Sequence, residues 1–288
     1  GTGGVVTNSS VTGATLTGAQ LTGQDLSGDD LSGTILTGAI LSRANLTGAT
    51  LTGANLKFAQ LDGVTGLRTA TLAGADLTGT DLSGQLLSGA DLSGTNLTSA
   101  NLTDADLSLA VMTEANLTRA NLTNADLSKA VLKDTTLTDV NGLAGATLTG
   151  TDLSGQDLSN LALAGKDLTG TILVGANLSG ANLANATLTD ATLARANLTN
   201  ATLTGATLTR STLANANLTN ATLTDAMLNS ADLTDTTLTG VSDADLLSAD
   251  LTNANLTGTQ LGNRDLAGID LAGVTLTRAN LTGANLAG

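Results

Sequence analysis

Residues 42–56 read SRANLTGATLTGANL, and this stretch decides the fold because it repeats one five-residue unit three times. Each unit has a leucine at its centre, at Leu46, Leu51 and Leu56, with an alanine two positions before it. The residue between the alanine and the leucine is polar, and threonine and glycine follow Leu46 and Leu51. We take the leucine as the reference position of the unit and its alanine as the second apolar position.

The same unit continues through almost the whole chain of 288 residues. The reference position holds methionine once, at Met112, and Val11 extends the pattern toward the start, so the chain contains about 55 units. Internal repetition at a fixed period is typical of a solenoid, in which each repeat contacts only its neighbours. The segments of unbroken register are residues 16–61, 67–137, 143–238 and 246–286.

A period of five residues excludes an ordinary helix and a straight strand. On a helix the leucines would drift around the axis, and on a strand successive leucines would alternate between opposite faces. The alanine and the leucine share one face, so the chain must bend once in each unit, after the leucine. Glycine, asparagine and aspartate are common there, and these residues tolerate tight bends. Short segments with regular bends predict a coil with alanine and leucine inside.

The units Ala44-Asn45-Leu46 and Ala54-Asn55-Leu56 follow the pattern A(D/N)Lxx, and the chain resembles the pentapeptide-repeat family. The resemblance implies an all-β fold, a right-handed quadrilateral β-helix with four units per coil and about 14 coils. With neighbouring strands ~4.8 Å apart, the rod would be roughly 65–70 Å long. We expect residues 1–288 to form a single solenoid of this kind.

Three breaks in register and six polar residues disturb the pattern. The breaks fall near residues 62–66, 138–142 and 239–245. We expect bulges at the corners of coils, with a protruding recognition feature as the alternative. The polar residues occupy alanine positions, and we expect their side chains to reach solvent at corners, with a site role for Asp29, Lys166 or Arg264 as the alternative. These residues are Gln24, Asp29, Gln85, Gln156, Lys166 and Arg264.

Composition argues against catalysis. The chain has no Cys, His, Pro, Trp or Tyr, and Phe58 is its one Phe. Histidine is the commonest general base and cysteine thiolate a common metal ligand, and the aspartates are expected on a convex outer face rather than in a pocket. We therefore predict a protein that is not an enzyme, with no catalytic residue, cofactor or metal.

Charge and hydropathy restrict the partners. The net charge of -14 argues against direct nucleic-acid binding, and no apolar run is long enough for membrane insertion. The unit continues in register to the last residues of the sequence, so we expect a structural or assembly protein that stacks end to end with itself, or a part of a longer solenoid. The candidate assembly edges are Val6, Val11, Leu276, Leu281 and Leu286. A surface of Thr, Ser, Asn and Asp favours an extracellular or cell-surface location, with the cytoplasm as the alternative.

Three other functions stay open. Some members of the family that the chain resembles mimic DNA and bind DNA gyrase, which the acidic surface would allow here, although its charge is roughly threefold sparser than that of DNA. A scaffold that binds another protein is the second alternative. Ice binding by outward threonines is the third, but the column Thr187, Thr207 breaks at Met227.

Overall fold

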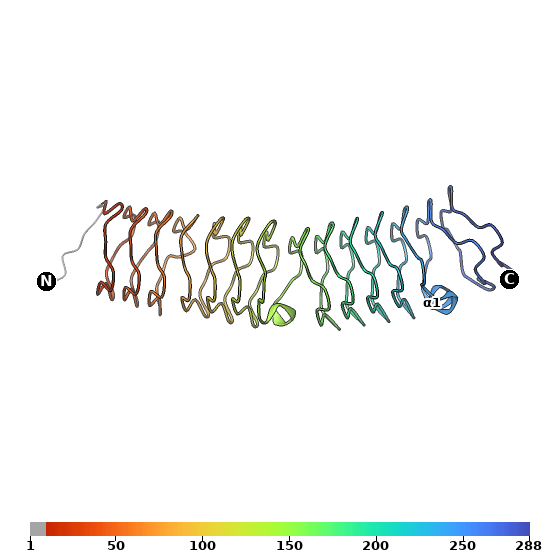
Figure 1. The fold of residues 1–288 in the computed structure, drawn as a ribbon, viewed down its shortest axis with the longest axis horizontal. Helices are drawn as coiled ribbons and strands as arrows, with labels where there is room; N and C mark the ends of the chain where they lie inside the picture. The colour runs from red at the N-terminus through yellow and green to blue at the C-terminus, as the bar shows by residue number, and fades with distance from the viewer. Residues whose placement is uncertain (1–9) are drawn as a thin grey trace. The chain divides into compact units, whose positions relative to one another are not determined.

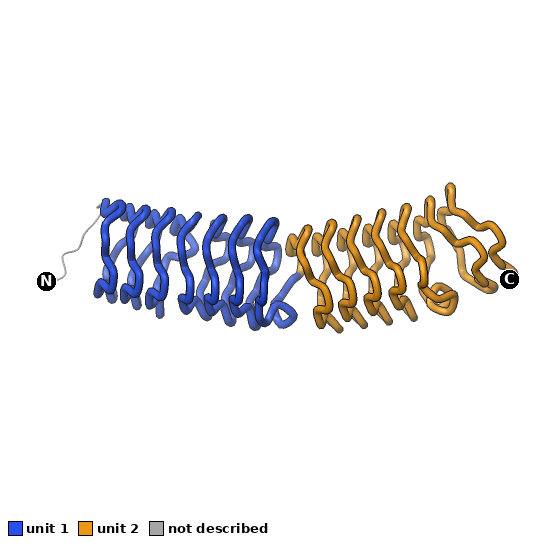
Figure 2. Tube along the Cα trace, viewed as in Figure 1, with its two compact units in different colours: residues 1–148 blue, residues 149–288 orange. Residues whose placement is uncertain are grey.

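The structure, a computed structural model, describes residues 10–288. Val6 lies outside the described residues. The chain divides into two compact units, residues 1–148 and residues 149–288 (Figure 2). Within each unit the backbone winds in successive coils that follow one another along the chain (Figure 1). A single solenoid over residues 1–288, its right-handed sense and the total of about 14 coils stay predictions.

Backbone pairing between coils is parallel and joins residues that lie four repeats apart. Asn96 bridges Asn116 in the first unit, and Asn197 bridges Asn217 in the second. Four repeats therefore make one coil, which confirms a β-solenoid of pentapeptide repeats. Each bridge is isolated, and the regular elements among residues 10–288 are the 3-10 helix η1 (Leu143–Gly145) and the α-helix α1 (Asp243–Ser248). Within residues 10–288, no helix is long and apolar enough to cross a membrane.

A tight turn closes each repeat at the position that the sequence predicts. The N–H of Ala44 donates to the carbonyl oxygen of Leu41 at 2.8 Å, and Arg43, which lies between them, has φ 61°. A positive φ at the third residue is the mark of a type II turn, which favours glycine and asparagine. Glu114 and Leu109 also take this conformation, at φ 60°, so the coil holds some side chains in a backbone region that they normally avoid.

The predicted inside and outside faces are confirmed. Leu203 and Ala206 are fully buried, while the intervening Thr204 is partly exposed. Threonine can replace the inward alanine because its hydroxyl finds a local acceptor: Thr95 Oγ1 donates to the Leu92 carbonyl oxygen at 2.6 Å. Each fully buried leucine contributes about 1.5–3 kcal/mol to folding.

Two of the six polar residues at alanine positions do not reach solvent. Asp29 is 2% exposed and Gln156 is 7% exposed, so the expectation of corner side chains in water is wrong for both. Gln24, Gln85, Lys166 and Arg264 are half-buried. Burial lowers the pKa of the Lys166 ammonium from its ordinary value, because desolvation disfavours the charged form.

The first two breaks have the same local structure, and each lengthens its coil by a single position. Thr50 bridges Thr71, one position beyond the regular spacing, so the inserted residue lies between Thr65 and Thr71. Gly66 takes the place of a reference leucine, with φ 84°. Its backbone approaches Thr47 so closely that any β-carbon would overlap the Thr47 main chain. The second break repeats this arrangement at Gly142, immediately before η1.

The third break is longer and holds α1. Met227 bridges Asp250, three positions beyond the regular spacing, and α1 replaces one side of the coil. Ser242 caps the helix: its hydroxyl oxygen accepts from the N–H of Asp245 at 3.0 Å and donates to that carboxylate at 2.6 Å. These two bonds provide an acceptor for the Asp245 N–H, which has no partner within so short a helix, and a donor for the Asp245 carboxylate.

Candidate interaction surfaces

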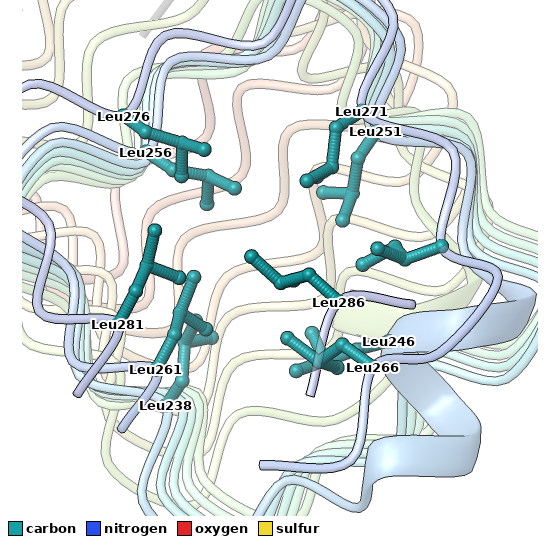
Figure 3. A pocket seen from close by; sticks show the side chains of 11 residues that line it. Leu238, Leu246, Leu251, Leu256, Leu261, Leu266, Leu271, Leu276, Leu281 and Leu286 are labelled. Atoms are coloured by element: carbon teal, nitrogen blue, oxygen red, sulfur yellow. The ribbon is translucent and has the colours of Figure 1, made fainter. Parts of the chain in front are cut away.

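The C-terminal coil edge consists of Leu271, Leu276, Leu281 and Leu286 and the backbone that carries them. These leucine side chains point toward the centre of the coil (Figure 3). The first three are half-buried and Leu286 is 42% exposed, whereas leucines one coil earlier are buried. The interior behind them holds a void of only about 10 Å³, lined by leucines and Ile269. This edge is therefore an apolar face with a packed interior behind it.

The backbone of the C-terminal coil edge offers open hydrogen-bond donors. Leu256 N–H donates to the Thr275 carbonyl oxygen at 2.8 Å, and Leu261 N–H donates to that of Asn280 at 2.8 Å. The equivalent N–H groups one coil on, at Leu276 and Leu281, have no acceptor within residues 10–288. An edge of this kind is a template for strand addition.

The N-terminal coil edge, Val11, Leu16 and Leu21, has the complementary pattern. All three side chains are half-buried. The N–H groups of Thr15 and Gln20 have no acceptor within residues 10–288, although the same groups in the next coil bond backward: Ile35 N–H donates to the Ala14 carbonyl oxygen at 2.9 Å. The structure thus places the sequence-predicted residues Val11, Leu276, Leu281 and Leu286 on coil edges, and their role in assembly stays a prediction.

The outer faces carry columns in which one carboxylate is followed by a run of amides. Asn101 Nδ2 donates to Asp81 Oδ1 at 3.0 Å, and Asn177 Nδ2 donates to Asp157 Oδ1 at 2.9 Å. Hydrogen bonds from the Ser159 hydroxyl, the Ser159 N–H and Asn177 lower the pKa of Asp157, so this carboxylate stays ionised at neutral pH. The asparagine ladder continues from Asn177 to Asn197, whose Nδ2 donates to Asn177 Oδ1 at 3.0 Å.

Arg264 connects two coils at the third break. Its Nη1 donates to the Val241 carbonyl oxygen and to Asp243 Oδ1, both at 2.8 Å, and its Nη2 donates to the Leu238 carbonyl oxygen at 2.7 Å. The side chain is 14% exposed. It occupies an alanine position but reaches back to two carbonyl groups and a carboxylate at the break, so its role here is structural.

We expect Arg264→Ala to lower the free energy of unfolding by about 2 kcal/mol, because it leaves two carbonyl groups and the Asp243 carboxylate without this donor. Chemical denaturation followed by circular dichroism measures the loss. Arg210→Ala is the matched control: Arg210 bonds both carboxylate oxygens of Asp190 at 2.8 Å, but its side chain is 58% exposed. Water screens that exposed pair, so its loss should be much smaller, and an equal loss from both variants would contradict a structural role of Arg264 at the break.

A groove opens beside the first break, and sequence reasoning did not anticipate it. Residues 63–67 form one wall and residues 83–86 form the other, around a space of about 410 Å³. Leu86 stands at its rim with 70% of its surface exposed. We call this feature the break groove.

Residues 10–288 contain no cluster of three or more acidic residues placed to hold a metal ion. The coil edges, the outer columns and the break groove offer backbone groups, amides and apolar side chains. Groups of these kinds are the ones that hold an added strand in complexes formed by strand addition.

A polypeptide with four repeats per coil, leucines inside and polar columns outside is a β-solenoid that presents surfaces for contact. The family description "Pentapeptide repeats (8 copies)" matches overlapping segments that together cover residues 7–65, 67–141 and 143–288. The chain belongs to the pentapeptide repeat family. The matched segments leave out only Gly66 and Gly142 after residue 7, which are the glycines of the first two breaks.

Solved structures of the family resemble the chain. HetL, a pentapeptide repeat protein involved in heterocyst differentiation regulation in the cyanobacterium Nostoc sp. strain PCC 7120, is 30% identical over 85% of this chain and 90% of its own, with a TM-score of 0.26. QnrB1, a plasmid-mediated fluoroquinolone resistance protein, is 20% identical over 84% and 91%, with a TM-score of 0.39. Rfr23 from the cyanobacterium Cyanothece 51142 is 27% identical over 48% and 89%, with a TM-score of 0.21. No curated protein matches the chain significantly.

Proposed function

We propose that the chain is a non-catalytic structural protein whose coils stack edge to edge with a second copy. Pentapeptide repeat homologues are generally non-catalytic. The observation that carries the proposal is the match between the two coil edges. The N–H groups of Leu276 and Leu281 on the C-terminal coil edge would donate to the carbonyl oxygens of Thr15 and Gln20 on the N-terminal coil edge, and the N–H groups of Thr15 and Gln20 would donate in return to open carbonyl oxygens of the C-terminal coil edge.

Stacking would repeat the contact that already joins successive coils. Between regular coils in the interior of each unit, each coil donates to the carbonyl groups of the next coil and receives donors from it. Joining the two edges would complete both sets of bonds and cover the exposed part of Leu286. The two edges are different surfaces, so the contact is heterologous and propagates into a fibre unless its geometry closes a ring.

We expect Leu281→Lys combined with Leu286→Lys to abolish this association, because two ammonium groups would have to be buried unpaired at the edge. Wild-type protein should form larger particles as its concentration rises, and the double variant should stay monomeric, as measured by light scattering and negative-stain electron microscopy.

The matched control is Thr277→Lys combined with Thr282→Lys, which adds the same charge to exposed outward positions of the same coil. This control should associate like the wild type. If the wild type stays monomeric at high concentration, the stacking proposal fails and a scaffold for another protein takes its place.

An acidic DNA mimic that binds DNA gyrase is a weaker candidate for this chain. The likeness to QnrB1, at 20% identity, concerns the fold. The carboxylates of Asp81 and Asp157 each accept from an asparagine of the next coil, and asparagines continue both columns, so each column carries one charge over four coils. DNA presents a charge about every 1.7 Å. A gyrase supercoiling assay decides this alternative directly, since a mimic would inhibit it.

A further inference from the structure

Three rungs of the backbone ladder are missing between the coil of the first break and the coil that follows it. One side is intact, where Asp76 bridges Asn96. On the other three sides Gln60, Thr65 and Thr71 bridge the preceding coil but no residue of the following coil. The residues that would face them bridge only onward, as Leu86 bridges Asp106. The two coils therefore separate around most of their circumference while their leucines stay buried.

The missing rungs leave hydrogen-bonding groups open on both walls of the break groove. In the next coil interface Gly84 N–H donates to the Thr103 carbonyl oxygen at 2.9 Å, and Asp106 N–H donates to that of Gln85 at 3.0 Å. The equivalent donors at the groove are the N–H groups of Gly63 and Leu86, which have no acceptor within residues 10–288. Each wall thus presents an unpaired strand edge, separated from the other by the groove.

Gln85 links the two coils beside the groove through its side chain. It replaces the usual inward alanine, and its Nε2 donates to the Leu61 carbonyl oxygen across the groove at 3.0 Å. The Leu61 carbonyl oxygen also accepts the N–H of its own turn at 3.1 Å, so the Gln85 amide adds a side-chain link between two coils that lack backbone bonds on this side. Leu86 next to it is apolar and exposed, while the same column holds Asp106 and Asp126 in the next two coils.

The lining of the groove also defines the chemistry of a ligand. None of residues 63–67 and 83–86 is charged, in a protein with a net charge of -14. An ion or a strongly charged ligand would find no partner there. Open N–H and carbonyl groups on two facing edges fit a polypeptide backbone in extended form, and Leu86 fits one aliphatic side chain.

We propose that the break groove binds an extended, uncharged peptide segment of a partner protein by strand addition, with an aliphatic side chain packed on Leu86. The segment supplies the rungs that the first break removes, on the side where Thr65 faces Leu86. None of the residues on the two coil edges takes part, so this site is separate from the proposed stacking contact.

The test uses an acetylated heptapeptide of alternating threonine and valine that ends in tryptophan. The protein has no Trp or Tyr, so tryptophan fluorescence anisotropy reports the peptide alone. We expect saturable binding to the wild type and to the Leu281→Lys, Leu286→Lys double variant, which excludes binding at the C-terminal coil edge. The same peptide with alternate amides N-methylated should bind at least about tenfold more weakly, because it cannot form both rows of bonds.

Two variants locate the site. Leu86→Asp places at the rim the residue that the column holds at Asp106, and should weaken binding about tenfold, or about 1.4 kcal/mol. Leu109→Asp is the matched control, because Leu109 is also exposed, at 56%, but lies outside the groove. It should leave binding unchanged.

Hydrogen exchange gives an independent measurement. The amides of Gly63 and Leu86 should exchange rapidly in the free protein and slowly with the peptide bound. The proposal is overturned by any of three results: no binding at millimolar peptide, equal binding of the N-methylated peptide, or equal loss in the Leu86 and Leu109 variants. Slow exchange of both amides in the free protein would also overturn it, since the ladder would then be closed.

Discussion

Replacing Leu203 by aspartate is expected to lower the free energy of unfolding of the second unit by more than about 4 kcal/mol, the largest effect of any substitution proposed. Leu203 is fully buried, and its coil bonds to both neighbours: Leu183 N–H donates to the Thr202 carbonyl oxygen and Leu203 N–H to that of Thr222, each at 2.8 Å. A carboxylate among stacked leucines would have no partner. Circular dichroism during chemical denaturation measures the loss.

Thr204→Asp is the control for this prediction, because it adds the same carboxylate at the next position along the chain, which is partly exposed. Its effect should stay within about 0.5 kcal/mol. Hydrogen exchange should show the damage from Leu203→Asp concentrated in the adjoining coils, since each coil of a solenoid contacts only its neighbours. Equal destabilisation by both substitutions would refute the assignment of inside and outside.

Gly66→Ala is expected to produce the second largest effect, a loss of about 3 kcal/mol, although it adds a single methyl group. Gly66 has φ 84°, and a β-carbon there would overlap the main chain of Thr47, which cannot rotate away. The substitution therefore combines strain in the backbone with overpacking against a neighbouring coil. Thermal and chemical unfolding of the variant measure the loss.

Gly48→Ala separates the two causes. Gly48 has a similar φ, 67°, but no atom lies within 4 Å of the place where its β-carbon would be. The substitution should cost only about 1 kcal/mol, the effect of a positive φ alone. Similar losses at Gly48 and Gly66 would mean that the close approach to Thr47 does not contribute.

The repeat itself could be predicted from the sequence because the leucine at every fifth position determines which side of the chain is buried. Each reference leucine must be buried, and each bend requires a residue that tolerates a positive φ. The spacing of these two kinds of residue therefore predicts the coils once four repeats per coil are assumed. The exact positions of the breaks were harder to predict from the sequence. Leucine spacing places the first break near 62–66, but the structure keeps regular pairing through Thr65 and puts Gly66 in the leucine position.

The candidate sites depend on contacts between residues more than one coil apart in the sequence, which a local pattern does not contain. Arg264 was expected to reach solvent, but it donates to the carbonyl group of Leu238, 26 residues earlier in the chain. Gln85 likewise donates to the carbonyl group of Leu61, 24 residues earlier. Leu86 occupies an outward position of the repeat, so its exposure could be predicted. The groove beside it results from missing bridges between two coils, which no local pattern in the sequence indicates.

The spacing of bridged residues, four repeats as between Asn96 and Asn116, constrains how genes for such chains can change. Duplicating four repeats adds a whole coil and leaves each outward residue in its column. Duplicating one repeat keeps leucines inside but moves every later outward residue to the neighbouring side of the coil. The family's short repeat thus permits two kinds of growth: one lengthens a surface, and the other rearranges it without disturbing the core.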